Sequence, residues 1–168
     1  ICCDEILHKM GISKYNFWDV FITTGFYSGY SKFAPGTMGA IVATLLWLIP
    51  YFFCEYMVLQ IITSIAILFF TFVSVPSIKR LEIEWGEDPS KVVVDEMVGV
   101  WIALLAVPEH GNWIYICAAF FLFRIFDIFK PLGVRYMEHF KGGWGVMLDD
   151  ILAGIYGALI ILVVGLFV

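Results

Sequence analysis

Residues 57–75, MVLQIITSIAILFFTFVSV, form an apolar stretch without a charged side chain. Its length approaches the ~20 residues that a helix needs to cross a hydrocarbon core of about 30 Å. Apolar and polar residues do not alternate along it, so a helix is predicted and not a β-strand. Similar stretches occur at 37–53, 92–107, 113–129 and 151–168. The sequence therefore predicts an all-α integral membrane protein, with a bundle of about five transmembrane helices.

The composition supports a bilayer as the solvent. Of the 168 residues, 61% are hydrophobic and 15% are charged, and the mean hydropathy is +0.91. Soluble domains carry about 25% charged residues. No repeat or linker interrupts the chain, so residues 1–168 are predicted to form a single membrane-embedded domain. Residues 1–35 would be its cytoplasmic or interfacial segment, with an interfacial helix within 15–31.

The distribution of basic residues predicts the topology, because Lys and Arg concentrate in cytoplasmic loops. With a cytoplasmic N-terminus, every basic residue falls at the cytoplasmic end of a helix or in a loop on that side, and residues 79–91 form a cytoplasmic hairpin. The loops around Glu55 and Glu109 contain no Lys or Arg. The net charge of −5 argues against a nucleic acid partner, because phosphate-backbone binding requires a basic face. The basic residues are Lys9, Lys14, Lys32, Lys79, Arg80, Lys91, Arg124, Lys130, Arg135 and Lys141.

Seven charged residues are predicted to share one layer near the cytoplasmic surface. An intramembrane charge costs about 2.5–3.5 kcal/mol at a helix centre, so a mutually compensated cluster facing the bundle interior is expected. Charged clusters inside a membrane usually have a function, although a set of structural ion pairs is the alternative interpretation. The seven residues are Asp95 and Glu96 in the third stretch, Arg124, Asp127 and Lys130 in the fourth, and Asp149 and Asp150 at the start of the fifth.

The charge balance of this layer points to a metal ion. Five carboxylates against two bases leave a deficit of three charges, which would repel an anionic ligand unless a divalent cation is bound. Mg²⁺ suits carboxylate oxygens and phosphate together. No His accompanies the carboxylates, which argues against Zn²⁺.

Two glycine-bearing turns face the same layer and could bind phosphate. Gly36, Thr37 and Gly39 begin the first apolar stretch, and Gly143 precedes Asp149. Helix N-termini and glycine-rich turns offer free N–H groups to anions. Small residues equally serve close packing between membrane helices, so both readings stay open.

Four blocks of the sequence together resemble the phosphatidylglycerophosphatase A family. They are GFYSGYSKFAPGTMGA at 25–40, VVVDEMVGVWIALLAVP at 92–108, FRIFDIFKPLGVRYME at 123–138 and GGWGVMLDDILAG at 142–154. The resemblance implies a Mg²⁺-dependent, multi-pass enzyme of the bacterial inner membrane that converts phosphatidylglycerophosphate to phosphatidylglycerol and phosphate. The acidic and basic motif residues carried over from the family are Asp95, Glu96, Arg124, Asp127, Lys130, Asp149 and Asp150. Lys141 departs from the family pattern and receives no role.

The expected mechanism follows from the charged layer. Most of the five carboxylates would hold one or two Mg²⁺ ions that activate a water molecule. Arg124 would bind the phosphate and Lys130 would stabilise the transition state. An aspartyl-phosphate intermediate is the mechanistic alternative. The alternative functions are another enzyme of membrane phospholipid synthesis, an ion-coupled transporter and a non-catalytic scaffold, while the oligomeric state stays open.

Overall fold

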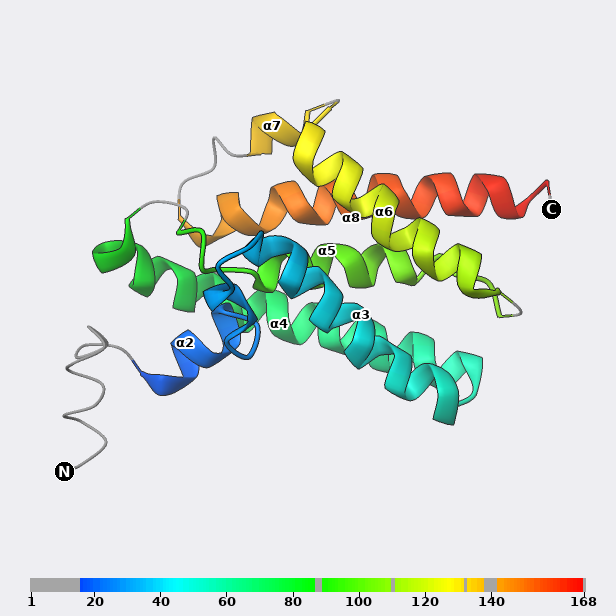
Figure 1. Ribbon diagram of the computed structural model, residues 1–168, viewed down its shortest axis with the longest axis horizontal. Helices are drawn as coiled ribbons and strands as arrows, with labels where there is room; N and C mark the ends of the chain where they lie inside the picture. The colour runs from blue at the N-terminus through cyan, green and yellow to red at the C-terminus, as the bar shows by residue number, and fades with distance from the viewer. Residues whose placement is uncertain (1–15, 87–88, 110, 132, 138–141, 168) are drawn as a thin grey trace.

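The computed structural model describes residues 16–167, except 87–88, 110, 132 and 138–141 (Figure 1). The described residues form helices and turns and contain no β-strand, which confirms the predicted all-α class. The helices are α2 (Phe17–Thr23), the 3₁₀-helix η1 (Ser28–Tyr30), α3 (Pro35–Phe53), α4 (Tyr56–Trp85), α5 (Val94–Leu104), α6 (Trp113–Phe129), α7 (Val134–Met137) and α8 (Gly143–Gly165).

Local sequence explains where the helices begin and end. Pro35 occupies the first turn of α3, where its missing N–H is not needed. The Asn112 side chain caps α6 by accepting a hydrogen bond of 3.0 Å from the Ile114 N–H. At the other end of α6, Lys130 adopts a left-handed conformation before Pro131. Lys130 therefore ends the helix, although its backbone is left-handed and not extended, as a residue before proline usually is.

The bundle is built around α5. The long helices lie roughly along the long axis of the molecule, and α5 lies among them (Figure 1). It packs against α3, α4, α6 and α8, and nearly all of its residues are buried. The other helices expose large apolar side chains, for example Ile65 and Phe72 of α4 and Leu162 of α8. This apolar exterior fits a hydrocarbon environment.

The five predicted membrane-crossing stretches all form helices, but two of these helices are short. Helices α3, α4 and α8 are long and apolar enough to cross a membrane. Helix α6 has 17 residues, and α5 has only 11, which correspond to about 26 and 16 Å at 1.5 Å per residue. The third predicted span, 92–107, is therefore an enclosed helix, because α5 buries its apolar residues against other helices and not against lipid.

Helix α4 extends further than predicted. It continues through Trp85, so the first part of the proposed 79–91 hairpin is helical. Burial of Ile78 and Leu81 explains this continuation, since these residues keep an apolar face on the helix beyond the predicted stretch 57–75. Helix α2 packs against this face. The predicted interfacial segment thus contains α2 and η1, whose exposed aromatic residues include Trp18 and Tyr27.

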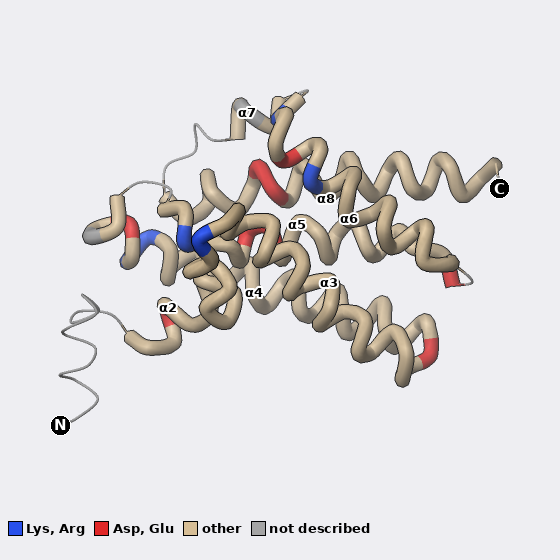
Figure 2. Tube along the Cα trace, in the orientation of Figure 1, with Lys and Arg blue, Asp and Glu red and all other residues tan. Residues whose placement is uncertain are grey.

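Charged residues are unevenly distributed along the bundle (Figure 2). Lys and Arg of the described chain occur on the half where α3, α5 and α8 begin, and the opposite turns carry only Asp or Glu. This arrangement agrees with the separation of basic residues along the sequence. Lys9, Lys14 and Lys141 lie outside the described residues, and the membrane orientation itself stays a prediction.

Asp19 joins α2 to α4. This buried carboxylate accepts hydrogen bonds from Ser77 Oγ at 2.7 Å and from Arg80 Nε at 2.9 Å. The Arg80 hydrogen bonds lower the pKa of Asp19 below its ordinary value, although burial opposes this effect. The interaction fixes α2 against the part of α4 that follows residue 75.

We expect Asp19→Asn to destabilise the protein by about 1 kcal/mol at pH 7, because a charge-assisted pair is lost while the half-exposed Arg80 regains water. Folding lowers the pKa of Asp19, so its contribution is complete above the unfolded-state pKa of about 3.9 and disappears as the pH falls through the folded-state value. Thermal unfolding in detergent between pH 7 and 3 should therefore show a difference between wild type and variant that shrinks in acid. The control is Glu55→Gln, the same chemical change at an exposed residue. A difference that is independent of pH would contradict the assignment.

Candidate active site

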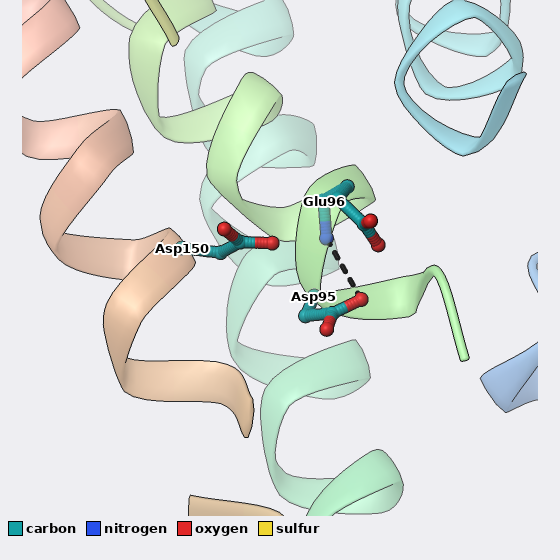
Figure 3. A group of neighbouring side chains, drawn as sticks. All are labelled: Asp95, Glu96 and Asp150. Carbon is teal, nitrogen blue, oxygen red and sulfur yellow. Dashed lines mark hydrogen bonds between the residues drawn. The ribbon is translucent and has the colours of Figure 1, made fainter. Parts of the chain in front are cut away.

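Three carboxylates from two helices converge at the centre of the charged layer (Figure 3). Asp95 and Glu96 lie in the first turn of α5, and Asp150 points toward them from α8. Each offers one oxygen, and the three oxygens lie within 4.8 Å of one another. Asp95 is oriented by its own helix, since its Oδ1 accepts a hydrogen bond of 3.0 Å from the Glu96 N–H. We call Asp95, Glu96 and Asp150 the carboxylate triad.

Two glycines allow the triad to form. A Cβ atom on Gly99 of α5 would lie 2.8 Å from the Asp150 carbonyl oxygen, and one on Gly154 of α8 would lie 2.3 Å from the Gly99 carbonyl oxygen. Both distances are shorter than real Cβ contacts. The close approach of the α5 and α8 backbones therefore depends on these glycines, and it brings Asp150 beside Asp95.

The other two acids of the layer pair with its two bases. Arg124 Nη1 donates a hydrogen bond to Asp127 Oδ2, one turn further along α6. Lys130 Nζ donates to Asp149 Oδ2 at 2.7 Å and so connects the end of α6 to α8. Asp149 and Asp150 lie beyond the first turn of α8, which begins at Gly143 and not at the predicted position near residue 149. Among the described residues, the five acids thus divide into a triad that forms no salt bridge and two acids that each form a salt bridge with a base.

The predicted phosphate-binding turns separate into different environments. Thr37 Oγ1 accepts a hydrogen bond of 3.2 Å from Arg124 Nη2. A Cβ atom on Gly36 would lie 2.0 Å from Glu96 Oε1 and 3.5 Å from Arg124 Nη1, so this glycine borders the site. Gly39 instead contacts Val93, and Gly143 contacts the backbone of Val75. The latter two positions therefore lie in packing contacts between segments, away from the triad.

Two buried polar atoms at the site lack a partner among the described residues. They are Glu96 Oε2 and Arg124 Nε. Buried polar atoms are nearly always hydrogen-bonded, so unpaired ones require an explanation. Three adjacent carboxylates that form no salt bridge with a described base also repel one another strongly. A divalent cation that prefers oxygen ligands resolves the carboxylate part of this problem, and the donor set of the triad fits Mg²⁺.

The sequence predicts the charged residues that the structure brings together here, but not the glycines that allow their helices to approach. Neither Gly99 nor Gly154 is among the candidate site residues predicted from the sequence. Their signal is visible in retrospect: each follows an acidic pair by three or four residues on its helix. This spacing places the glycine about one turn from the acids, on the same helix face.

Comparisons with known proteins place these features in a family context. The sequence model of the family described as phosphatidylglycerophosphatase A matches residues 21–165. A Bacteroides thetaiotaomicron protein, provisionally named a phosphatidylinositol-3-phosphatase, is 56% identical over 88% of this chain and 94% of its own length. Two similar proteins are named phosphatidylglycerophosphatase A. The Escherichia coli protein is 32% identical over 94% of this chain and 88% of its own length. The Haemophilus influenzae protein is 36% identical over 83% of this chain and 84% of its own length. No solved structure matches the chain significantly.

Proposed function

Because the chain belongs to the phosphatidylglycerophosphatase A family, we propose that it hydrolyses phosphatidylglycerophosphate to phosphatidylglycerol and inorganic phosphate. The observation that carries the proposal is an oxygen-rich triad on α5 and α8 beside two basic residues, Arg124 and Lys130, of the neighbouring helix α6. Such a site can hold a divalent cation and an anionic phosphate together. The apolar exterior of the bundle fits a substrate that is itself a membrane lipid.

A second substrate deserves comparison because one relative carries a different name. Phosphatidylinositol 3-phosphate and phosphatidylglycerophosphate are both lipids with a polyol headgroup that bears a phosphomonoester. The bond to be hydrolysed is therefore chemically equivalent, and the two substrates differ in the polyol. Two relatives at 32 and 36% identity bear the glycerophosphate name, and one at 56% bears the inositol name. We favour phosphatidylglycerophosphate because the family description agrees with two of the three names.

Asp95, Glu96 and Asp150 would hold Mg²⁺ in this proposal. A bound Mg²⁺ supplies Lewis acidity toward phosphate oxygens and lowers the pKa of a water ligand. Hydrolysis requires attack of a water oxygen on phosphorus, cleavage of the phosphorus–oxygen ester bond and transfer of a proton to the departing polyol oxygen. An aspartyl-phosphate route would replace the first attack by a carboxylate oxygen.

Arg124 and Lys130 would bind and stabilise the transferred phosphoryl group. Arg124 offers a planar fork that matches phosphate oxygens. Asp127 and Thr37 hold the guanidinium in place, and Asp149 holds the Lys130 ammonium. These interactions restrict both bases before the substrate arrives. Preorganised charges of this kind stabilise a transition state without further rearrangement.

The site is proposed to face the cytoplasm of a bacterial inner membrane. The support is the positive-inside rule, since the charged layer lies on the half of the molecule that carries the Lys and Arg residues (Figure 2). An ion-coupled transporter is less well supported, because no acidic or basic residue of the described spans lies between the charged layer and the opposite turns at Glu55 and Glu109. A non-catalytic scaffold would not require a carboxylate triad.

We expect Gly36→Ala to reduce phosphate release by about 10- to 100-fold, because its Cβ would displace Glu96 from the triad and small misplacements of a catalytic group have effects of this size. The measurement is the initial rate with vesicles containing phosphatidylglycerophosphate. Gly165→Ala is the matched control, since a Cβ atom on Gly165 of α8 meets no atom within 4 Å. Equal rates for the two variants would show that Gly36 has no role at the site.

The proposed function is tested by a lipid panel. Purified protein is incubated with vesicles of phosphatidylglycerophosphate, phosphatidylinositol 3-phosphate or phosphatidic acid, with and without Mg²⁺, and released phosphate is measured. We expect Mg²⁺-dependent release with the first lipid as the preferred substrate. Preference for the inositol lipid would replace the substrate and keep the reaction class. Absence of release from all three, together with ion flux in liposomes, would favour a transporter.

A further inference from the structure

Val93, immediately before α5, is enclosed by three glycines from the N-terminal part of the chain. A Cβ atom would lie 2.9 Å from Val93 Cγ2 if built on Gly25, 3.2 Å from Val93 Cγ1 if built on Gly29 and 2.7 Å from Val93 Cβ if built on Gly39. The side chain is fully buried. We call Gly25, Gly29 and Gly39 the glycine socket.

The backbone of Val93 is fixed as tightly as its side chain. Its N–H donates a hydrogen bond of 2.9 Å to the carbonyl of Thr23 at the end of α2, and its own carbonyl accepts one of 3.1 Å from Met97, the first turn of α5. A Cβ atom on Gly29 would also lie 2.1 Å from the Lys91 carbonyl oxygen, so two residues of this connection touch η1. The α2–η1 segment therefore determines where α5 begins.

This attachment bears directly on the carboxylate triad. Asp95 and Glu96 follow Val93 by two and three residues and lie in the first turn of α5. Any shift or rotation of the helix start moves both carboxylates relative to Asp150, which is attached to α8. The contact of Gly36 with Glu96 and the contact of Gly39 with Val93 are one turn apart on α3, so α3 restrains the same turn of α5 at two points.

We propose that Val93 is a positioning residue: its fit in the glycine socket sets the geometry in which Asp95 and Glu96 bind Mg²⁺. The inference rests on the proposed function, because it assumes that the triad is the metal site. It assigns a role in the active site to residues 23–39, which include no acid or His. It also explains why three glycines are needed where α2, η1 and α3 meet the start of α5.

The test measures binding of Mg²⁺ alone to the full chain in detergent. The thermal unfolding midpoint is followed as Mg²⁺ is added, which gives an apparent Kd independent of turnover. We expect Val93→Ala to raise this Kd about 10-fold or more, as substitutions behind metal ligands typically do. Val93→Thr keeps the branched shape and should stay within about twofold of wild type, since the socket remains filled.

Val100→Ala is the matched control. It removes the same two methyl groups from a fully buried valine of α5 that lies away from the glycine socket. It should lower the unfolding midpoint without changing the Mg²⁺ Kd. Gly25→Ala would press its Cβ on Val93 Cγ2 and should raise the Kd too, which keeps the test decisive if Val93→Ala does not fold.

The outcomes separate this inference from the proposed function. If wild type binds Mg²⁺ and releases phosphate but Val93→Ala and Val100→Ala have equal Kd values, the positioning role is wrong and the proposed function stands. If the wild-type midpoint does not respond to Mg²⁺, the assignment of the triad fails, and the inference fails with it.

Discussion

Asp95→Asn should reduce phosphate release by about 10³-fold or more, which corresponds to a loss of at least about 4 kcal/mol of transition-state stabilisation. Asp95 contributes an oxygen to the triad and lies at the start of α5, where no base of the described chain forms a salt bridge with it. An amide has the same shape and can still accept the Glu96 N–H through its oxygen. It cannot supply the negative charge that a bound cation requires.

Stability distinguishes a catalytic carboxylate from a structural one in this experiment. Three adjacent carboxylates repel one another, so Asp95→Asn should leave the thermal unfolding midpoint in chelator unchanged or higher. A structural ion-pair role predicts a lower midpoint instead. Glu109→Gln, an exposed change at the opposite turns, serves as the control and should retain full activity. If Asp95→Asn retained wild-type activity, the assignment of the triad as the catalytic site would be wrong.

Removal of divalent cations should have an equally large effect. In excess chelator, phosphate release by the wild-type protein is expected to fall to background, because the triad then carries an uncompensated negative charge beside the phosphate site. Addition of Mg²⁺ beyond the chelator should restore the rate. The measurement is the initial rate against free Mg²⁺ concentration, with phosphatidylglycerophosphate in vesicles.

The lipid surface itself binds divalent cations, so a control must separate effects on the substrate from effects on the protein. The unfolding midpoint without lipid provides it, since stabilisation by Mg²⁺ alone reports binding to the protein. Turnover that persists in excess chelator would rule out the metal-dependent mechanism. Activity that requires Mg²⁺ without any Mg²⁺-dependent stabilisation would place the cation on the lipid.

Much of the fold could be predicted from the sequence because the membrane imposes a simple rule. Long apolar stretches must be helical, and the Lys and Arg residues separate the two ends of the bundle. Hydropathy could not reveal that residues 92–107 form a short enclosed helix, because a buried helix and a lipid-facing one have similar composition. Because Lys79 and Arg80 are charged, the sequence likewise predicted a loop where α4 continues. This continuation depends on burial of Ile78 and Leu81.

The sequence could predict that the charged residues share one depth in the bundle, but not which of them pair with one another. Arg124 and Asp127 are three residues apart, so their pairing follows from one helix. The pairing of Lys130 with Asp149 and the approach of Asp150 to Asp95 depend on how α8 crosses α6 and α5. That crossing is set by close contacts at Gly99 and Gly154, and such contacts cannot be derived from charge spacing.

The shortness of α5 has a consequence for biosynthesis. A helix of 11 residues that carries Asp95 and Glu96 is too short and too polar to partition into a bilayer by itself. Its partner acid, Asp150, lies on α8, which leaves the ribosome after α5 and α6. We therefore expect α5 to become stably embedded only when later helices enclose it. The carboxylate triad accordingly forms only after α8 has been inserted, so we expect a chain that ends before α8 to be inactive.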